Sequence, residues 1–172
     1  TAGGYGQYIR VPANWAVKMP AGLDAREAMI IGTAGFTAAL CVDKIEQMGA
    51  QPSDGPVVVT GATGGVGSVA VALLAKLGYD VVASSGKAEK DDYLKSLGAG
   101  SVISRADLSE ENKRPMAAET WAHGIDTVGG EILSNVIKGL KYSGSVAICG
   151  LVASPAFSTT VLPFFLRNVN VL

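Results

Sequence analysis

The sequence predicts an α/β fold, in which a doubly wound parallel sheet of about six strands has helices on both faces. Two observations support this prediction. Short β-branched segments alternate with helical segments from residue 57 to residue 172, and this order of elements is typical of right-handed crossovers between parallel strands. In addition, residues 57–60 form the continuous apolar run Val-Val-Val-Thr, which indicates a strand that is buried on both faces of a sheet.

The first 50 residues predict extended segments followed by helices. An alternating pattern predicts a strand at 5–11, and a second short extended segment is expected at 15–19. Asp24 is a candidate N-cap residue, and Glu27 stands three positions later, as in a capping box. Gly32 and Gly35 interrupt the helical pattern that follows, which therefore predicts two helices rather than one. These helices are residues 25–31 and 33–48.

The remaining strands and helices follow from the same patterns. The predicted strands are residues 57–60, 80–84, 101–103, 125–128, 145–149 and 169–172. The predicted helices are residues 66–77, 88–97, 107–122 and 131–140. The helix at 107–122 has the weakest pattern because Pro115 interrupts it. Residues 142–166 contain prolines and glycines and are predicted to form strand, loop and strand.

The length and composition indicate how many domains the chain contains and argue against one class of binding partner. The chain has 172 residues, the size of one domain or of one domain with a remnant of another. Its 14 Lys and Arg residues against 15 Asp and Glu residues give a net charge of −1, which argues against a basic nucleic-acid-binding face. Only 17% of the residues are charged and 22 are glycine. We therefore expect a fragment of a longer protein, which covers some of the apolar surface.

Membrane, thiol and metal chemistry are not expected. Residues 142–166 are interrupted by prolines, and the 15 uncharged residues 28–42 are too few to cross a bilayer. Cys41 and Cys149 are distant in sequence and lie in apolar segments, which predicts buried reduced thiols of a cytoplasmic protein, with a disulfide or a catalytic thiol as the alternative. His123 is the single histidine, so no zinc-ligand set exists and a surface or structural role is expected for it.

The segment between the first buried strand and the next helix predicts nucleotide binding. Residues 61–67 are Gly-Ala-Thr-Gly-Gly-Val-Gly, which follows the pattern G-x-G-x-x-G from position 62 with alanine in the first glycine position. Gly64 would let the backbone approach a pyrophosphate, and Gly67 would let the helix pack closely on the strand. The N–H groups of Gly65 and Val66 are the expected donors. The pattern predicts a Rossmann-type domain, and a merely structural turn is the alternative.

The end of the second strand indicates which dinucleotide is bound. NAD-binding domains usually have Asp or Glu here, whereas this chain has Ser84, Ser85, Gly86 and Lys87. A hydroxyl and an ammonium group would hold a 2′-phosphate that a carboxylate would repel, so the sequence favours NADP(H) over NAD(H). Arg105 follows the third strand and could add charge there, or it could be a solvated surface residue.

Other polar and aromatic residues have open roles. Asp126 ends the fourth strand, where it could orient the backbone or contact the cofactor. Trp121, Phe164 and Phe165 are expected to be core residues rather than groups that stack on a cofactor. No Ser/His/Asp set can be assembled, and no catalytic residue is predicted.

Several longer segments carry a resemblance to a known family. The chain resembles the nucleotide-binding part of the medium-chain dehydrogenase/reductases, in particular the zinc-free, quinone-oxidoreductase-like branch close to the NADPH-dependent acrylyl-CoA reductases. The similarity extends over essentially the whole chain, and the strings at 28–38 and 93–99 are more specific than the glycine-rich turn. The segments that carry it are residues 20–25, 28–38, 58–67, 93–99, 125–129 and 166–169.

The resemblance implies roles for individual residues in binding NADP(H). The pyrophosphate loop would be Gly64, Gly65, Val66, Gly67 and Ser68. The 2′-phosphate pocket would be Ser85, Gly86 and Lys87, with Arg105 beside them. The residues near the nicotinamide and its ribose would be Thr33, Thr37, Gly150, Leu151 and Phe165.

The resemblance also implies a reaction and an assembly. Members of this branch transfer hydride from NADPH to the β-carbon of an α,β-unsaturated acyl thioester such as acrylyl-CoA, without zinc. Residues 1–20 would be a remnant of the catalytic, GroES-like domain, residues 21–172 would be the Rossmann domain, and the isolated chain would be inactive. A quinone reductase and a non-catalytic nucleotide-binding domain remain alternatives. The strand at 169–172 would pair with its copy in a homodimer.

Overall fold

The computed structural model describes residue 4 and residues 6–172, and the chain divides into two compact units on either side of the Gly32–Thr33 bond. The first unit contains the short 3₁₀-helix η1 (Ala13–Trp15) and the first residues of helix α1 (Ala25–Gln47). The border coincides with Gly32, whose φ of 50° and ψ of −159° are not helical. The predicted break between two helices is therefore confirmed at Gly32.

The first unit contains one confirmed prediction and one that is wrong. Its capping box is formed: the Glu27 backbone N–H donates to Asp24 at 2.7 Å, and the Asp24 backbone N–H donates to the Glu27 carboxylate at 2.9 Å. The predicted strand at 5–11 is wrong for residues 6–11, while Tyr5 lies outside the described residues. The expected extended segment at 15–19 begins in η1 and forms no strand. Strands require a hydrogen-bonded neighbour, and no described residue pairs with either segment.

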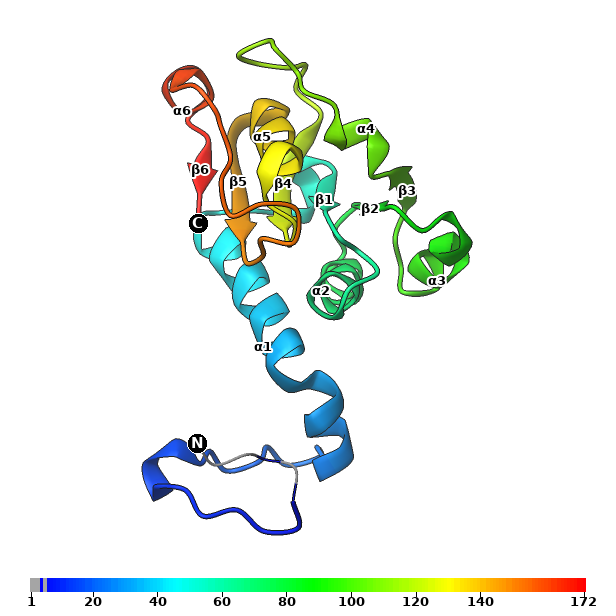
Figure 1. Cartoon of the computed structure of the whole chain (residues 1–172), viewed down its shortest axis with the longest axis vertical. Coiled ribbons are helices and arrows are strands. Elements are labelled where there is room, and N and C mark those ends of the chain that lie inside the picture. The colour runs from blue at the N-terminus through cyan, green and yellow to red at the C-terminus, as the bar shows by residue number, and fades with distance from the viewer. Residues whose placement is uncertain (1–3, 5) are drawn as a thin grey trace. The chain divides into compact units, whose positions relative to one another are not determined.

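The second unit contains a six-stranded parallel sheet, which confirms the predicted fold class. The strand order is β3-β2-β1-β4-β5-β6, and Figure 1 shows the strands side by side in this order. This is the order of a Rossmann-type sheet, and its direction of winding reverses between β1 and β4. The strands are β1 (Val57–Val59), β2 (Val81–Ser85), β3 (Ser101–Ser104), β4 (Trp121–Asp126), β5 (Leu140–Ile148) and β6 (Asn170–Val171).

Helices cover both faces of this sheet. Val57 and Val59 of β1 belong to one core cluster, whereas Val58 belongs to the other, as the alternation of side chains along a strand requires. The first cluster packs beneath α1, α2 and α3, and the second beneath α4 and α5. The helices that follow α1 are η2 (Pro52–Asp54), α2 (Gly65–Lys76), η3 (Ala88–Lys90), α3 (Asp91–Ser96), α4 (Ala106–Ser109), α5 (Gly130–Lys138) and α6 (Leu162–Arg167).

Helix α1 is long and apolar enough to cross a membrane by length and composition, and it is the one such helix among the described residues. Its second part instead packs against the sheet. Ala38, Cys41, Val42 and Ile45 belong to the first core cluster and are buried. The non-helical Gly32 also divides the apolar segment. This packing is that of a core helix of the α/β unit.

Two predicted segments differ from the structure. The helix at 107–122 is limited to α4, because side chains take the carbonyl groups that a longer helix would have used. The Asn135 amide donates to the carbonyls of Leu108 and Glu110, and the Lys138 ammonium donates to that of Asn112 at 2.6 Å. The prediction of strand, loop and strand at 142–166 missed α6, which has proline in its first turn and ends at Asn168 with a left-handed φ of 51°.

Candidate functional site

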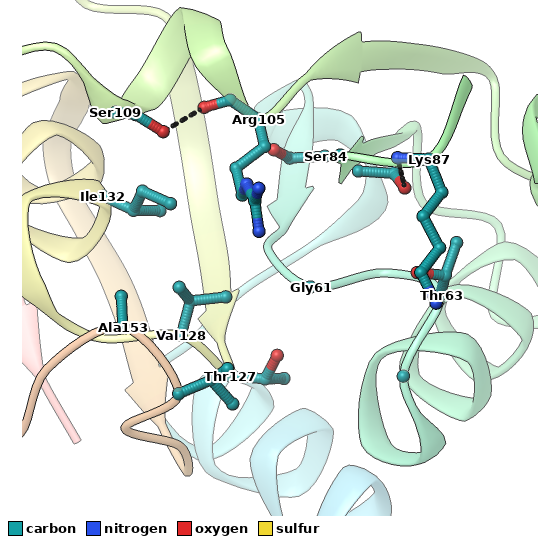
Figure 2. Close-up of a pocket in the computed structure, with 14 residues that line it drawn as sticks. Gly61, Thr63, Ser84, Lys87, Arg105, Ser109, Thr127, Val128, Ile132 and Ala153 are labelled. Atoms are coloured by element: carbon teal, nitrogen blue, oxygen red, sulfur yellow. Dashed lines mark hydrogen bonds between the residues drawn. The ribbon is translucent and has the colours of Figure 1, made fainter.

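A cavity of about 600 Å³ lies at the carboxyl-terminal edge of the sheet, where the strand order reverses (Figure 2). Ligands bind at this position in open α/β sheets because the loops after neighbouring strands diverge there. Its walls come from the loops that follow β1, β2, β4 and β5 and from helices α4 and α5. The lining residues are Gly61, Thr63, Gly64, Ser84, Ser85, Gly86, Lys87, Arg105, Ser109, Thr127, Val128, Ile132, Val152 and Ala153.

The glycine-rich turn that joins β1 to α2 packs its backbone closely against the first turn of α2. The Gly64 N–H donates to the Gly61 carbonyl at 2.9 Å, and Gly61 has a left-handed φ of 59°. A Cβ atom on Gly67 would lie 2.8 Å from Cα of Ala62 and still closer to the Gly61 carbonyl oxygen. Only glycine therefore permits α2 to begin against this turn, as the sequence predicted for position 67.

The first turn of α2 provides free backbone donors. In the described part of the chain, no acceptor is found for the N–H groups of Gly65, Val66 and Gly67, whereas the Ser68 N–H donates to the Gly64 carbonyl at 2.9 Å. The N-cap residue Gly64 has no side chain that could accept from them. Free N–H groups and the positive end of the helix dipole together favour a bound anion, such as a pyrophosphate.

The end of β2 presents hydroxyl groups and cations to the same cavity. The Ser84 side chain is buried, and its Oγ has no hydrogen-bond partner. Ser85 Oγ accepts from the Lys87 N–H at 3.0 Å. Neither Lys87 nor Arg105 forms an ion pair with an acidic residue among the described residues. Figure 2 shows the Arg105 side chain extending into the cavity between Ser84 and Ile132. These groups suit a phosphate monoester.

Gly86 lies under the Arg105 guanidinium. A Cβ atom at position 86 would be 3.0 Å from Cζ of Arg105, closer than ordinary van der Waals contact. The Arg105 N–H also donates to the Ser85 carbonyl at 2.8 Å, which ties the end of β3 to the end of β2. Arg105 therefore lines the cavity, and it is also exposed to solvent, so both roles that the sequence left open for it are compatible with its position.

The opposite wall consists of the turn at 127–130 and the loop at 150–154. Asp126, immediately before the turn, is completely buried and does not line the cavity. Its carboxylate accepts from the Val128 and Gly129 N–H groups at 3.2 and 2.7 Å. Burial raises the pKa of Asp126, and its hydrogen bonds oppose that rise. Of the two roles left open by the sequence, the structure shows the orientation of backbone.

The sequence-predicted site residues fall into three groups in the structure. The five that line the cavity are Gly64, Ser85, Gly86, Lys87 and Arg105. The others that neighbour it are Gly65, Val66, Gly67 and Ser68 in the first turn of α2, and Gly150 and Leu151 beside the lining residue Val152. Those on other elements are Thr33 and Thr37 of α1, where the Thr37 hydroxyl donates to the Thr33 carbonyl at 2.8 Å, and Phe165 of α6.

Sequence reasoning did not single out the lining residues Thr127, Val128, Val152 and Ala153. Each follows the carboxyl end of β4 or β5, and this position after a predicted strand could have identified them as lining residues. The expectation that three aromatic residues belong to the core is confirmed for Trp121 and Phe164, which pack against the second cluster. It is wrong for Phe165, which is 80% exposed because neighbouring residues on α6 point in different directions.

The two cysteines and the histidine lie outside the cavity lining. Contrary to the sequence separation, Cys41 and Cys149 are neighbours: a hydrogen bond between the thiols lowers the pKa of Cys41, and the same bond together with burial raises the pKa of Cys149. Both are free thiols. His123 is a buried structural residue that contacts Asp54. The described residues contain no group of three or more His, Cys, Asp or Glu side chains that could hold a metal.

The sequence of residues 65–172 matches the profile of a zinc-binding dehydrogenase. The chain belongs to the zinc-binding dehydrogenase family. Among its relatives, the probable acrylyl-CoA reductase AcuI of Escherichia coli K12 is 55% identical over 168 residues, which are 98% of this chain and 51% of the relative. The predicted resemblance to the quinone-oxidoreductase-like branch is thus confirmed.

Two solved structures have the same fold as this chain. The yhdH oxidoreductase of Salmonella enterica, in complex with NADP, has a TM-score of 0.91 and 56% identity, covering 94% of this chain and 49% of that one. The Bacillus subtilis protein yhfP, with NAD bound, has a TM-score of 0.91 and 49% identity over the same shares of the two chains. The chain spans about half the length of these relatives.

Proposed function

We propose that this chain is the cofactor-binding part of an NADPH-dependent reductase that acts on an α,β-unsaturated acyl thioester such as acrylyl-CoA. The observation that carries the proposal is the end of β2, where Lys87 and Arg105 face a cavity without an acidic partner among the described residues. The unpartnered Ser84 hydroxyl beside them is a further polar group that a ligand would satisfy. A 2′-phosphate has the charge and acceptor oxygens that these groups require.

The residues fit a bound NADP(H) along the whole edge of the sheet. Ser85, Gly86, Lys87 and Arg105 would hold the 2′-phosphate. The loop formed by Gly64, Gly65, Val66, Gly67 and Ser68 would hold the pyrophosphate, with the free N–H groups of Gly65, Val66 and Gly67 as the donors. Thr33, Thr37, Gly150, Leu151 and Phe165 are proposed for the nicotinamide end. The described fold supports this order, since the loops after β2, β1 and β4 line one cavity.

Reduced nicotinamide supplies a hydride when it is bound, and reduction of the substrate also needs a proton at the α-carbon. The part of this chain in that reaction is to bind and orient the dinucleotide and to exclude water from one side of it. Val128, Ile132, Val152 and Ala153 give the cavity an apolar wall for this purpose. We assign no catalytic residue to this chain, since the groups that would hold the substrate are proposed to lie in a separate catalytic domain.

The identity of the substrate is proposed from the relatives. The Escherichia coli relative is named as a probable acrylyl-CoA reductase, and one from Bacillus subtilis as a putative quinone oxidoreductase. We favour the acyl thioester because the first of these has the higher identity, 55% against 49%. A quinone reductase is the second candidate, and a nucleotide-binding domain without catalytic activity is the third.

One assay of the complete protein separates the three candidates. The rate of NADPH oxidation is measured with acrylyl-CoA and, separately, with a benzoquinone as the acceptor. We expect a higher kcat/KM with acrylyl-CoA. A preference for the quinone would support the second candidate, and NADPH binding without turnover of either acceptor would support the third.

Three further proposals concern the complete protein. Residues 1–20 would belong to the catalytic domain and residues 21–172 to the Rossmann domain of a cytoplasmic enzyme. The outer edge of β6 has no partner strand among the described residues, and an unpaired edge favours pairing with another strand. We therefore propose a homodimer through residues 169–172. A solution mass equal to one subunit would contradict it.

A further inference from the structure

A buried hydrogen-bond network joins the ends of β1 and β4 beneath the cavity. The Thr60 hydroxyl donates to the Asp126 carboxylate at 2.6 Å and accepts from the Thr127 N–H at 3.0 Å. The Thr127 hydroxyl donates back to the Thr60 carbonyl at 2.9 Å. The second carboxylate oxygen of Asp126 accepts from the N–H groups of Val128 and Gly129. The Asp126 and Thr60 side chains together thus hold the N–H groups of three successive residues, 127–129, in the turn after β4.

The same network reaches the loop after β5. The Asp126 carbonyl accepts from the Cys149 N–H at 2.9 Å, and the Val128 carbonyl accepts from the Ala153 N–H at 2.9 Å. Residues 129 and 154 form a β-bridge. Gly129 has a left-handed φ of 75°, and a Cβ atom there would collide with the Ser154 carbonyl oxygen. The turn and the loop are therefore one packed unit whose geometry depends on the carboxylate beneath it.

This unit forms one wall of the cavity. Thr127 and Val128 of the turn, with Val152 and Ala153 of the loop, line it. Figure 2 shows Thr127, Val128 and Ala153 on the side of the cavity away from Lys87. If the 2′-phosphate lies at the end of β2 and the pyrophosphate at the start of α2, the nicotinamide half must extend toward this wall.

An aspartate is specifically suited to this position. Its two oxygens face three donors, namely the Thr60 hydroxyl and two backbone N–H groups. An asparagine has the same shape but replaces one acceptor oxygen with an NH₂ group, which would face a donor. A buried donor that faces another donor loses its hydrogen bond and its solvation together.

We propose that Asp126 is a positioning residue, which holds the wall formed by residues 127–130 and 150–154 in the geometry that receives the nicotinamide half of the dinucleotide. This proposal rests on the proposed function, because that function supplies the ligand. Asp126 itself touches neither cofactor nor substrate. Its effect reaches the ligand through the Val128 and Gly129 N–H groups and through the loop that packs on them.

The test compares two ligands that differ in the nicotinamide half. NADPH contains the nicotinamide half, whereas 2′,5′-ADP contains the adenosine and its phosphates and lacks that half. In the complete protein, Asp126→Asn lowers the affinity for NADPH by at least about tenfold, because a buried hydrogen bond is left unsatisfied. The affinity for 2′,5′-ADP is unchanged. Calorimetric titration with each ligand measures the ratio of the two affinities, and kcat at saturating NADPH falls as well.

Thr60 supplies a second pair of variants that does not remove the carboxylate. Thr60→Val keeps the shape of the side chain and removes the hydroxyl, and it lowers the affinity for NADPH but not the affinity for 2′,5′-ADP. Thr60→Ser keeps the hydroxyl and restores the wild-type ratio of the two affinities. This pair decides the question if Asp126→Asn does not fold. Asp54→Asn, the same change at the other edge of the sheet, is the matched control and alters neither affinity.

Each outcome distinguishes the inference from the function on which it rests. A wild-type protein that binds neither ligand overturns the proposed function. A wild-type protein that binds both, with variants that lose both ligands equally, assigns Asp126 and Thr60 a merely structural role. Unchanged NADPH affinity in Asp126→Asn, or in Thr60→Val, also overturns the inference.

Discussion

The polar side chains at the two edges of the parallel sheet differ in whether they have hydrogen-bond or ion-pair partners. At the amino-terminal edge, His123 Nε2 lies 3.1 Å from the Asp54 carboxylate, and His123 Nδ1 accepts from the Ser145 N–H at 3.2 Å. The Lys141 ammonium there donates to the Asp54 carbonyl at 3.1 Å. At the carboxyl-terminal edge, the Ser84 hydroxyl has no partner, and the cations beside it have no acidic partner among the described residues.

This difference separates a structural edge from the edge at which we propose that NADP(H) binds. Because Nδ1 of His123 accepts a backbone hydrogen bond, its Nε2 carries the proton and donates to Asp54, so both ring nitrogens are used. A buried polar group without a partner costs about 1–3 kcal/mol, which is why such groups are rare in folded proteins. Ser84, one of the residues that line the cavity, keeps such an unsatisfied hydroxyl.

The largest expected effect comes from adding a methyl group to Gly67, where α2 begins at the carboxyl-terminal edge of the sheet. In Gly67→Ala, the new Cβ would overlap the backbone of Gly61 and Ala62, so α2 must move away from the turn. We expect NADPH binding to be lost and the free energy of unfolding to fall by about 1–3 kcal/mol. Lys76→Ala, at the exposed end of the same helix, is the control. Tight NADPH binding by Gly67→Ala would refute the account of the turn.

The next effect tests the charge at the end of β2. Lys87→Glu places a carboxylate where the 2′-phosphate is proposed to lie, so NADPH should bind about 10- to 100-fold more weakly while NADH is little affected. The preference for NADPH over NADH is then inverted. Lys90→Glu makes the same change of charge three residues away, outside the cavity lining, and should leave the preference unchanged. Fluorescence titration with both cofactors measures it.

Smaller effects are expected from a substitution of Ser84, which should stabilise the ligand-free protein but weaken the binding of NADPH. Ser84→Ala removes a buried hydroxyl that has no partner, so the ligand-free protein should gain up to about 1 kcal/mol of unfolding free energy. The same variant should bind NADPH several-fold more weakly, because the hydroxyl finds its partner in the ligand. Denaturant unfolding and cofactor titration give the two values. A destabilised ligand-free variant would mean that Ser84 is already satisfied.

The smallest effect belongs to the amino-terminal edge. The hydrogen bond from His123, followed by that from the Gln51 N–H, lowers the pKa of Asp54 below its ordinary value of 3.8. Asp54 therefore contributes stability above pH 3.8, and this contribution is lost as the pH falls through its folded-state pKa. Because the side chain is 40% exposed, the contribution is small. The difference in stability between wild type and Asp54→Asn should shrink toward acid pH, with NADPH affinity unchanged.

The sequence predicted the elements whose causes are local. The run 57–60 and the glycines at 61–67 lie next to each other in the chain, so the strand, the turn and the helix could be recognised together. The Asp24–Glu27 capping box was likewise predictable from residues three positions apart. Lys87, which the sequence predicts to hold a 2′-phosphate, lines the cavity, and it could be singled out because it follows directly after the end of a strand.

The sequence did not predict features that depend on distant partners. The segment 110–120 is not helical because Asn135, Lys138 and Arg167 satisfy its carbonyl groups. Thr127, Val128, Val152 and Ala153 enter the cavity lining because a buried network packs two loops together, which no local pattern records. The proximity of Cys41 to Cys149 depends in the same way on how α1 packs against the end of β5.

We propose that the unpaired polar groups at the carboxyl-terminal edge form an NADP(H) site. Parallel calorimetric titrations of the complete wild-type protein with NADPH and with NADH measure the contribution of the 2′-phosphate to binding. NADPH should bind at least about tenfold more tightly, since the 2′-phosphate adds charge-assisted hydrogen bonds from Lys87 and Arg105. Equal affinities, or tighter binding of NADH, would contradict it.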